Sequence, residues 1–226
     1  MVHQDNTYTG KMIVFEGIDG SGKATQTEML FSRLRENGEK VEKIAFPRYG
    51  EVAAEKIEHY LAGKMGDMGV KDAAKLYAYD RKDASELMYR WLIQGKTIIV
   101  DRYVASNMGH QGGKIQDKGE RRTFFEWLYE YEYATMSIPK PDVQIFLDVK
   151  PQASGVLRKQ DTHRKGDIHE NNTSHLENAY DSYQDFITFS QTIGDSFLTV
   201  QCESSGGMRP IDAIHNDVWR GVRENV

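Results

Sequence analysis

The feature that most constrains this chain is a glycine-rich segment near its N-terminus. Residues 17–23 read GIDGSGK and fit the pattern G-x-x-x-x-G-K. The apolar run MIVFE precedes the segment directly, and a helical pattern that ends near Gly38 follows it. Glycines allow backbone N–H groups to turn toward an anion, and a following helix adds partial positive charge at its N-terminus. The sequence therefore predicts a phosphate-binding loop (P-loop) and disfavours an incidental glycine-rich turn. The predicted phosphate-binding residues are Gly17, Gly20, Ser21, Gly22, Lys23, Ala24 and Thr25.

One position of this loop departs from the usual pattern. Ala24 stands where a serine or threonine hydroxyl would bind Mg²⁺. Either the site works without a metal ion, or other groups hold the ion. Mg²⁺ needs only one or two carboxylates besides phosphate oxygens and waters. Asp101 ends the apolar run TIIVD, so we predict that it holds Mg²⁺ through water. Asp19 and Glu16 are weaker metal candidates, and Glu16 can equally be the polar end of a strand.

Strand-like and helix-like segments alternate along the chain. The short apolar runs lie at residues 12–16, 41–46, 97–101, 143–149 and 197–201. Residues 71–94 repeat apolar side chains at helical spacing. The stretch YEYEY at 129–133 alternates like a strand, but its flanks keep the longer period, which favours a helix. This alternation predicts the α/β class, a three-layer sandwich with a five-stranded parallel sheet and helices on both faces.

Length and composition limit the other possibilities. A chain of 226 residues with 39% hydrophobic residues can bury one substantial core, so we expect a single domain over residues 1–226. Its net charge of -5 does not favour nucleic-acid or membrane-surface binding, and we expect neither partner. Cys202, the single cysteine, cannot form an intramolecular disulfide. No apolar run reaches the ~20 residues that span a bilayer, and the first residues lack the apolar core of a signal peptide. We therefore expect a cytoplasmic location.

Two pairs of residues have the chemistry of a nucleotide site, although each also has a structural explanation. Tyr77 and Arg81 are four residues apart on a predicted helix, so they can stack on a base and donate to its carbonyl edge. A packed tyrosine with a surface arginine fits the same spacing. Asp101 and Arg102 form either a buried ion pair or a site for metal and phosphate at a strand end.

The motifs as a set resemble one family. FEGIDGSGKATQ at 15–26, FPRYG at 46–50, LYAYDR at 76–81 and DRYVASN at 101–107 are similar in order and spacing to the thymidylate kinases. The resemblance covers residues 12 to about 197. It implies an enzyme that uses ATP and Mg²⁺ to phosphorylate dTMP to dTDP by in-line transfer, and commonly a homodimer. The small-molecule partners would be dTMP and ATP.

The resemblance also implies site residues. An acceptor-nucleotide region spans about 46–111, and a polar lid spans about 155–173. The implied catalytic residues are Lys23, Arg48, Asp101, Arg102, Arg158 and Arg164. The implied dTMP-binding residues are Asp19, Phe46, Pro47, Arg48, Tyr77, Arg81, Arg102, Tyr103, Ser106, Asn107, His110 and Gln111.

Three points stay open at this level. His110 stands where the family often has tyrosine, and a surface histidine explains it as well as a substrate contact. His163, His169 and His175 lack metal-site spacing, so we expect solvated lid and helix residues. The alternatives to a dTMP kinase are a kinase for another nucleoside monophosphate or deoxynucleoside and, less favoured, a P-loop protein that binds nucleotide without catalysis.

Overall fold

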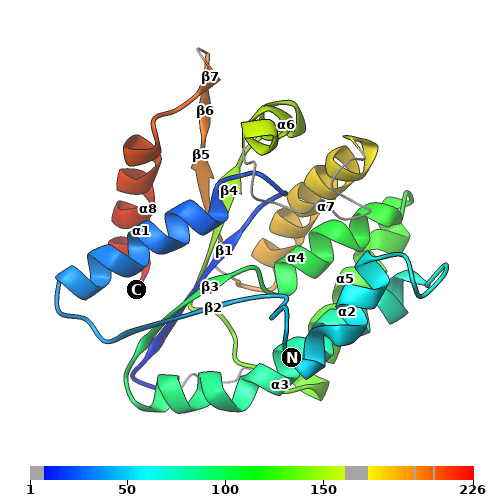
Figure 1. Ribbon diagram of the computed structural model, residues 1–226, viewed down its shortest axis with the longest axis horizontal. Coiled ribbons are helices and arrows are strands. Elements are labelled where there is room, and N and C mark those ends of the chain that lie inside the picture. Colours follow the sequence, from blue (N-terminus) through cyan, green and yellow to red (C-terminus); the bar gives the residue numbers. More distant parts are fainter. Residues whose placement is uncertain (1–7, 161–172, 196, 206) are drawn as a thin grey trace.

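A five-stranded parallel sheet forms the centre of the molecule (Figure 1). The computed structural model describes residues 8–160, 173–195, 197–205 and 207–226. The strands lie in the order β2-β3-β1-β4-β5. Their bounds are β1 Lys11–Glu16, β2 Val41–Ala45, β3 Thr97–Asp101, β4 Val143–Asp148 and β5 Phe197–Gln201. All five strands predicted from the sequence are confirmed.

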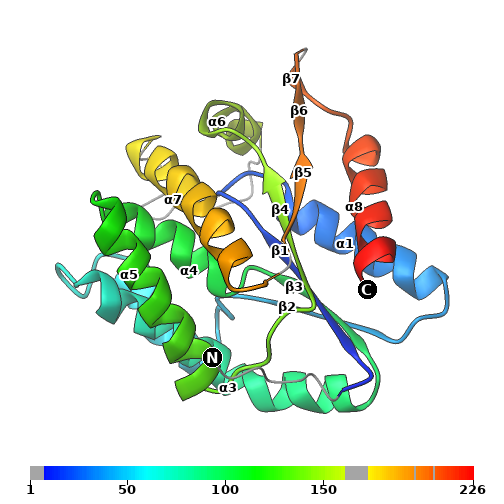
Figure 2. The same cartoon turned by 180° about the vertical axis from the view of Figure 1, so that it is seen from behind.

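Helices cover both faces of the sheet, which confirms the three-layer arrangement (Figures 1 and 2). The helices α1 (Lys23–Glu36) and α8 (Ile211–Asn225) lie on one face. The other face carries α3 (Val70–Ile93), α4 (Val104–His110), α5 (Lys118–Tyr129) and α7 (Thr173–Thr192). Alternate residues of β1 supply the two cores: Ile13 packs with Leu30 of α1, and Met12 packs with Met88 of α3. Side chains on a strand point to opposite faces in turn, so one apolar strand can serve both layers.

Shorter elements complete the edges. The 3₁₀ turn η1 (Val52–Ala54) and α2 (Glu55–Leu61) pack on α3 through a small separate cluster that includes Ile57 and Ala73. The turn η2 (Gly112–Lys114) follows α4, and α6 (Pro151–Gln160) follows β4. An antiparallel pair, β6 (Glu203–Ser204) and β7 (Gly207–Met208), connects β5 to α8. Cys202 is a free, buried thiol.

The YEYEY stretch is helical, but the helix widens after Tyr129, its first residue. After α5, residues Glu130–Thr135 form a π-helix, η3, which buries Glu132 and Tyr133. The helical period favoured by the flanks was therefore right. Widened helical turns are rare and occur often at functional sites.

The candidate site lies at the carboxyl ends of three neighbouring strands. The P-loop follows β1, Asp101 is the last residue of β3, and Asp148 is the last residue of the parallel strand β4. Ligands of such sheets bind outside the carboxyl ends of the strands. Among the described residues, no helix is both long and apolar enough to cross a membrane.

Candidate active site

The P-loop has the conformation that its glycines allow. Gly22 caps the N-terminus of α1 with φ 87°, a left-handed conformation that disfavours side chains. At Gly17, with φ 143°, a Cβ atom would lie 2.7 Å from Ser21 Oγ and 3.0 Å from the carbonyl oxygen of Leu147. Larger residues at these positions would therefore displace the loop from β4 or from the start of the helix.

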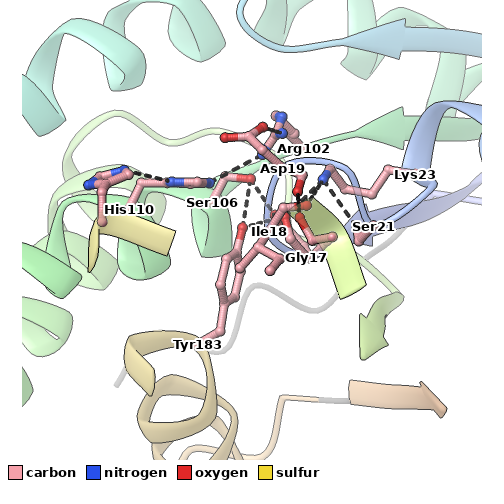
Figure 3. Close-up of polar contacts among 12 residues, drawn as sticks. Gly17, Ile18, Asp19, Ser21, Lys23, Arg102, Ser106, His110 and Tyr183 are labelled. Carbon is pink, nitrogen blue, oxygen red and sulfur yellow. Dashed lines mark hydrogen bonds and ion pairs between the residues drawn. The ribbon is translucent and has the colours of Figure 1, made fainter. Parts of the chain in front are cut away.

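Lys23 lies across the loop that it belongs to (Figure 3). Its Nζ donates to the carbonyl oxygens of Gly17 at 2.9 Å and Ile18 at 2.8 Å, and to Ser21 Oγ at 3.3 Å. Burial, with a smaller contribution from the positive charge of Arg102, lowers the pKa of Lys23 to about 7. Asp101 and Asp19 oppose that shift. A phosphate brought to the loop would meet an ammonium group already aimed at the loop interior, and its negative charge would favour the protonated form.

Glu16 anchors the neighbouring segments to the end of β1. Its side chain is fully buried and accepts hydrogen bonds from the backbone N–H of Tyr103 at 2.8 Å, from Ser106 Oγ at 2.6 Å and from the Tyr183 hydroxyl at 3.1 Å. Burial raises its pKa, and the hydrogen bonds from Ser106 and Tyr103 work in the opposite direction. Protein donors contact both carboxylate oxygens, so the structure gives Glu16 an internal structural role, and the weaker suggestion that it binds metal stays a prediction.

Arg102 is held from three sides in an unusual backbone conformation. Its φ is 67°, although it is not glycine, and its backbone N–H donates to the Phe15 carbonyl oxygen at 3.0 Å. The guanidinium forms an ion pair with Asp19 and donates to His110 Nε2 at 3.3 Å. Burial opposes its charge, but Asp19 together with Tyr183, Asp101 and Glu16 outweighs burial and raises the pKa of Arg102. Strained residues of this kind concentrate at functional sites.

The contacts of Arg102 continue through His110 (Figure 3), which in turn contacts His175 of α7. Burial lowers the pKa of His110 to about 3, so the ring is neutral at neutral pH. Because Nε2 accepts from Arg102, the proton lies on Nδ1, which faces His175 Nε2 at 3.4 Å. The two rings stack with centroids 5.6 Å apart. His175 is therefore half-buried against α4, whereas the sequence analysis expected a solvated residue.

One cavity collects most of the predicted acceptor residues. Ten of them line it: Asp19, Phe46, Pro47, Tyr77, Arg81, Arg102, Ser106, Asn107, His110 and Gln111. Three further lining residues, Tyr49, Leu61 and His175, were not predicted. Tyr49 lies within the quoted FPRYG motif, so the motif could have indicated it. Leu61 and His175 come from α2 and α7, and only helix packing brings them to the cavity.

Two predicted contacts support the cavity from outside. Arg48 Nε donates to Asp80 Oδ1 at 2.8 Å, and its Nη2 donates to Asp83 Oδ2 at 2.6 Å. The Tyr103 ring is fully buried, and its hydroxyl donates to the Pro139 carbonyl oxygen at 2.9 Å. Neither side chain lines the cavity. In this conformation Arg48 and Tyr103 hold the cavity wall, and their contacts with substrate stay predictions.

Two buried oxygen atoms at the site have no hydrogen-bond donor among the described residues: Asp101 Oδ1 and Gln111 Oε1. An acceptor that is buried without a donor needs a ligand, a water or a metal ion to compensate it. Asp101 lies at the end of β3 beside Lys23 and Arg102, where its charge affects the pKa of both. Ala24 is exposed at the start of α1 and offers no ligand atom. No cluster of three or more His, Cys, Asp or Glu side chains within the described part of the chain could hold a metal ion.

The lid prediction falls mostly outside the described residues. Arg164 lies there, and Arg158 lies in the part of α6 whose side chains are not described. The start of α6 is placed, however, and Ser154 Oγ donates to the Asp19 carbonyl oxygen. The helix that leads toward the predicted lid therefore begins on the P-loop itself.

Comparisons with known proteins agree with these observations. The family profile described as thymidylate kinase matches residues 15–201. A thymidylate kinase from Mycobacterium tuberculosis is 35% identical over 147 residues, which cover 64% of this chain and 68% of that protein. The human thymidylate kinase is 27% identical over 210 residues, which cover 92% of this chain and 88% of that protein. A solved structure of a thymidylate kinase from Candida albicans has a similar fold, with a TM-score of 0.72, 22% identity, and coverage of 96% of this chain and 92% of that one.

Proposed function

The chain belongs to the thymidylate kinase family, and from this premise we propose that its P-loop and the Arg102 cavity are the donor and acceptor sites for phosphoryl transfer. The enzyme phosphorylates dTMP with ATP as the donor, which gives dTDP and ADP. The observation that carries the site assignment is the contact between the two sites. Asp19, which lies within the P-loop, forms an ion pair with Arg102, which lines the cavity.

The cavity suits a pyrimidine nucleoside monophosphate. Phe46 and Tyr77 supply aromatic surface, whereas Arg81 and Asn107 supply polar atoms. Such a mixture of apolar walls and a few placed polar groups is typical of small-molecule sites. We place the base between these walls and the acceptor phosphate at Arg102, because the guanidinium there is charged and faces the loop that binds the donor.

The reaction needs no general base from the protein. The second phosphate pKa is about 6, so the attacking oxygen of dTMP is already an anion at neutral pH. What remains is to bring two polyanions together in line and to neutralise charge as it moves onto the leaving phosphate. Lys23 and Arg102 serve this purpose in our proposal. His110 stays neutral, so it can accept from Arg102 without adding a competing positive charge.

We propose that Mg²⁺ binds beside Asp101. The support is the Asp101 Oδ1 atom, which is buried and has no donor among the described residues. A carboxylate oxygen is a preferred Mg²⁺ ligand, and waters and phosphate oxygens can complete the coordination. When bound, Mg²⁺ neutralises charge on the donor phosphates. Ala24 offers no ligand atom, but the proposed site does not need one from this position, so alanine here is compatible with kinase activity.

Three finer features are also part of the proposal. Arg158 and Arg164 act as lid cations that approach the transferred group when the lid closes over the P-loop, and closure excludes water from the reaction. The enzyme is cytoplasmic, and it forms homodimers as the resemblance implies. Sedimentation of the purified protein tests the dimer, because a monomer at micromolar concentration would contradict it.

An ADP-release assay across nucleoside monophosphates tests the function. We expect ADP release that depends on dTMP and Mg²⁺, and weaker release with purine monophosphates or with free thymidine. A protein that binds ATP but gives no dTMP-dependent ADP release would refute the transferase assignment. Preference for another acceptor would keep the site and change the substrate.

A further inference from the structure

Glu132 is a buried carboxylate that the sequence motifs did not indicate. The π-helix η3 carries it into the core behind the acceptor cavity, where its side chain is fully buried. A buried charge is costly unless it is paired and hydrogen-bonded. Glu132 satisfies both conditions through two residues that line the cavity, Arg81 and Asn107.

The Glu132 carboxylate binds the Arg81 guanidinium through both of its oxygens. Arg81 Nε donates to Glu132 Oε2 at 2.6 Å, and Nη2 donates to Oε1. Its Nη1 donates to the Tyr103 carbonyl oxygen at 3.3 Å. Burial opposes the charge of Arg81, and the carboxylate of Glu132 outweighs it and raises the pKa of Arg81. An arginine has five N–H donors in a rigid plane, so these three bonds fix the plane and leave two donors for a ligand.

The same carboxylate fixes which way the Asn107 amide faces. Asn107 Nδ2 donates to the Ala74 carbonyl oxygen at 2.9 Å and to Glu132 Oε1 at 3.3 Å. Both partners can only accept, so the NH₂ group must face them. The two amide hydrogens are then in use, and the carbonyl oxygen Oδ1 is the polar atom that Asn107 offers to a ligand. The orientation follows from the chemistry of its neighbours.

From this arrangement we propose that Glu132 is a positioning residue that determines which base the cavity accepts. It sets a donor, Arg81, beside an acceptor, Asn107, on the polar side of the cavity. This inference rests on the proposed function, because it assumes that the acceptor base lies there. The order of donor and acceptor complements the adjacent C=O and N–H groups of thymine and uracil.

The proposal predicts rejection of cytosine. At the corresponding edge, cytosine has an amino group where thymine has a carbonyl, and an unprotonated ring nitrogen where thymine has N–H. Both contacts would then pair like with like, donor against Arg81 and acceptor against Asn107. Sites built to hydrogen-bond a substrate discriminate strongly when the pattern fails, by ~10⁴-fold in favourable cases. Glu132 is the support that Arg81 and Asn107 share, in addition to the Tyr103 carbonyl for Arg81 and the Ala74 carbonyl for Asn107.

The variant Glu132→Gln tests this idea with almost no change in shape. A glutamine has one acceptor and one donor group, so it cannot accept from Arg81 Nε, Arg81 Nη2 and Asn107 Nδ2 together. Whichever way it turns, one N–H faces another N–H. We expect the ratio of kcat/KM for dTMP to that for dCMP to fall at least ~10-fold, with most of the loss in the KM for dTMP. The KM for ATP should stay unchanged.

The controls separate positioning from general damage. dUMP has the same polar edge as dTMP, so the ratio of dTMP to dUMP should not change in Glu132→Gln. Glu130→Gln, an exposed position on the same π-helix, should keep wild-type selectivity. If Glu132→Gln does not fold by circular dichroism, Glu132→Asp replaces it, because it keeps the charge opposite Arg81 but is too short to reach Asn107 as well. Its selectivity should fall in the same direction.

The possible results distinguish the positioning role of Glu132 from the proposed kinase activity. An unchanged ratio of dTMP to dCMP in folded Glu132→Gln or Glu132→Asp would overturn the positioning role, as would equal losses with dTMP, dUMP and dCMP. A wild-type enzyme that accepts dCMP as well as dTMP would also overturn it. A wild-type protein without activity on dTMP would instead refute the proposed function.

Discussion

The depressed pKa of Lys23 predicts that nucleotide affinity falls as the pH rises above neutrality. With a pKa of about 7 in the free enzyme, the ammonium form decreases across the range in which a normal lysine stays fully charged. Bound polyphosphate favours the charged form and restores the pKa toward its usual value near 10.4. Binding must therefore take up a proton wherever free Lys23 is neutral and bound Lys23 is charged, which is the window from about pH 7 to 10.

The magnitude follows from the fraction of protonated Lys23. A group with a pKa of about 7 is about 24% protonated at pH 7.5 and about 1% protonated at pH 9, so the apparent Kd for an ATP analogue should rise about 25-fold, or ~1.9 kcal/mol. At pH 8, each binding event should take up about 0.9 proton. Titration calorimetry with a non-hydrolysable analogue, in buffers of different ionisation enthalpy, measures both quantities.

Two variants at the same position provide the control. Lys23→Arg keeps its charge at every pH in the range, so its affinity should not change between pH 7.5 and pH 9. Lys23→Met should bind weakly at every pH, without proton uptake. A wild-type Kd that stays constant between pH 7.5 and pH 9, with uptake below about 0.2 proton at pH 8, would show that burial does not depress the Lys23 pKa as argued.

The remaining predictions concern the metal, the acceptor phosphate and the cavity wall. Asp101→Asn removes the charge of a carboxylate whose Oδ1 has no donor among the described residues, so half-maximal activity should need at least ~10-fold more Mg²⁺; an unchanged Mg²⁺ titration would contradict the metal assignment. Arg102→Lys cannot contact both Asp19 and His110 with a planar fork, so kcat/KM for dTMP should fall ~100-fold or more, which steady-state kinetics measures; a loss below about fivefold would contradict its role. Tyr103→Phe removes the hydrogen bond to the Pro139 carbonyl, so the free energy of unfolding should fall by ~1 kcal/mol in urea while the KM for dTMP stays within about twofold; a large KM change would mean that the Tyr103 side chain contacts substrate after all.

Local sequence patterns accounted for the scaffold and for the P-loop. The P-loop needs glycines at fixed spacing between a strand and a helix, so adjacent residues contain the whole signal. The five strands could also be predicted from local sequence, because buried parallel strands are nearly continuous apolar runs. Ten of the cavity residues were also identified, although only the family resemblance, and not spacing alone, distinguished Tyr77 and Arg81 from ordinary core residues.

The tertiary structure decided how those residues are held. Asp19 and Arg102 are 83 residues apart, Arg81 and Glu132 are 51 apart, and Glu16 and Tyr183 are 167 apart. No local period connects such pairs. Asp19 and Arg102 meet because they follow the neighbouring strands β1 and β3, whereas the other two pairs meet only when η3 and α7 pack on one face of the sheet. For the same reason the sequence did not indicate the contacts that Arg48 and Tyr103 make at the cavity wall, or the packing of His175 on His110. The P-loop is specified by neighbours along the chain, whereas the orientation of its catalytic partners is specified by helix packing.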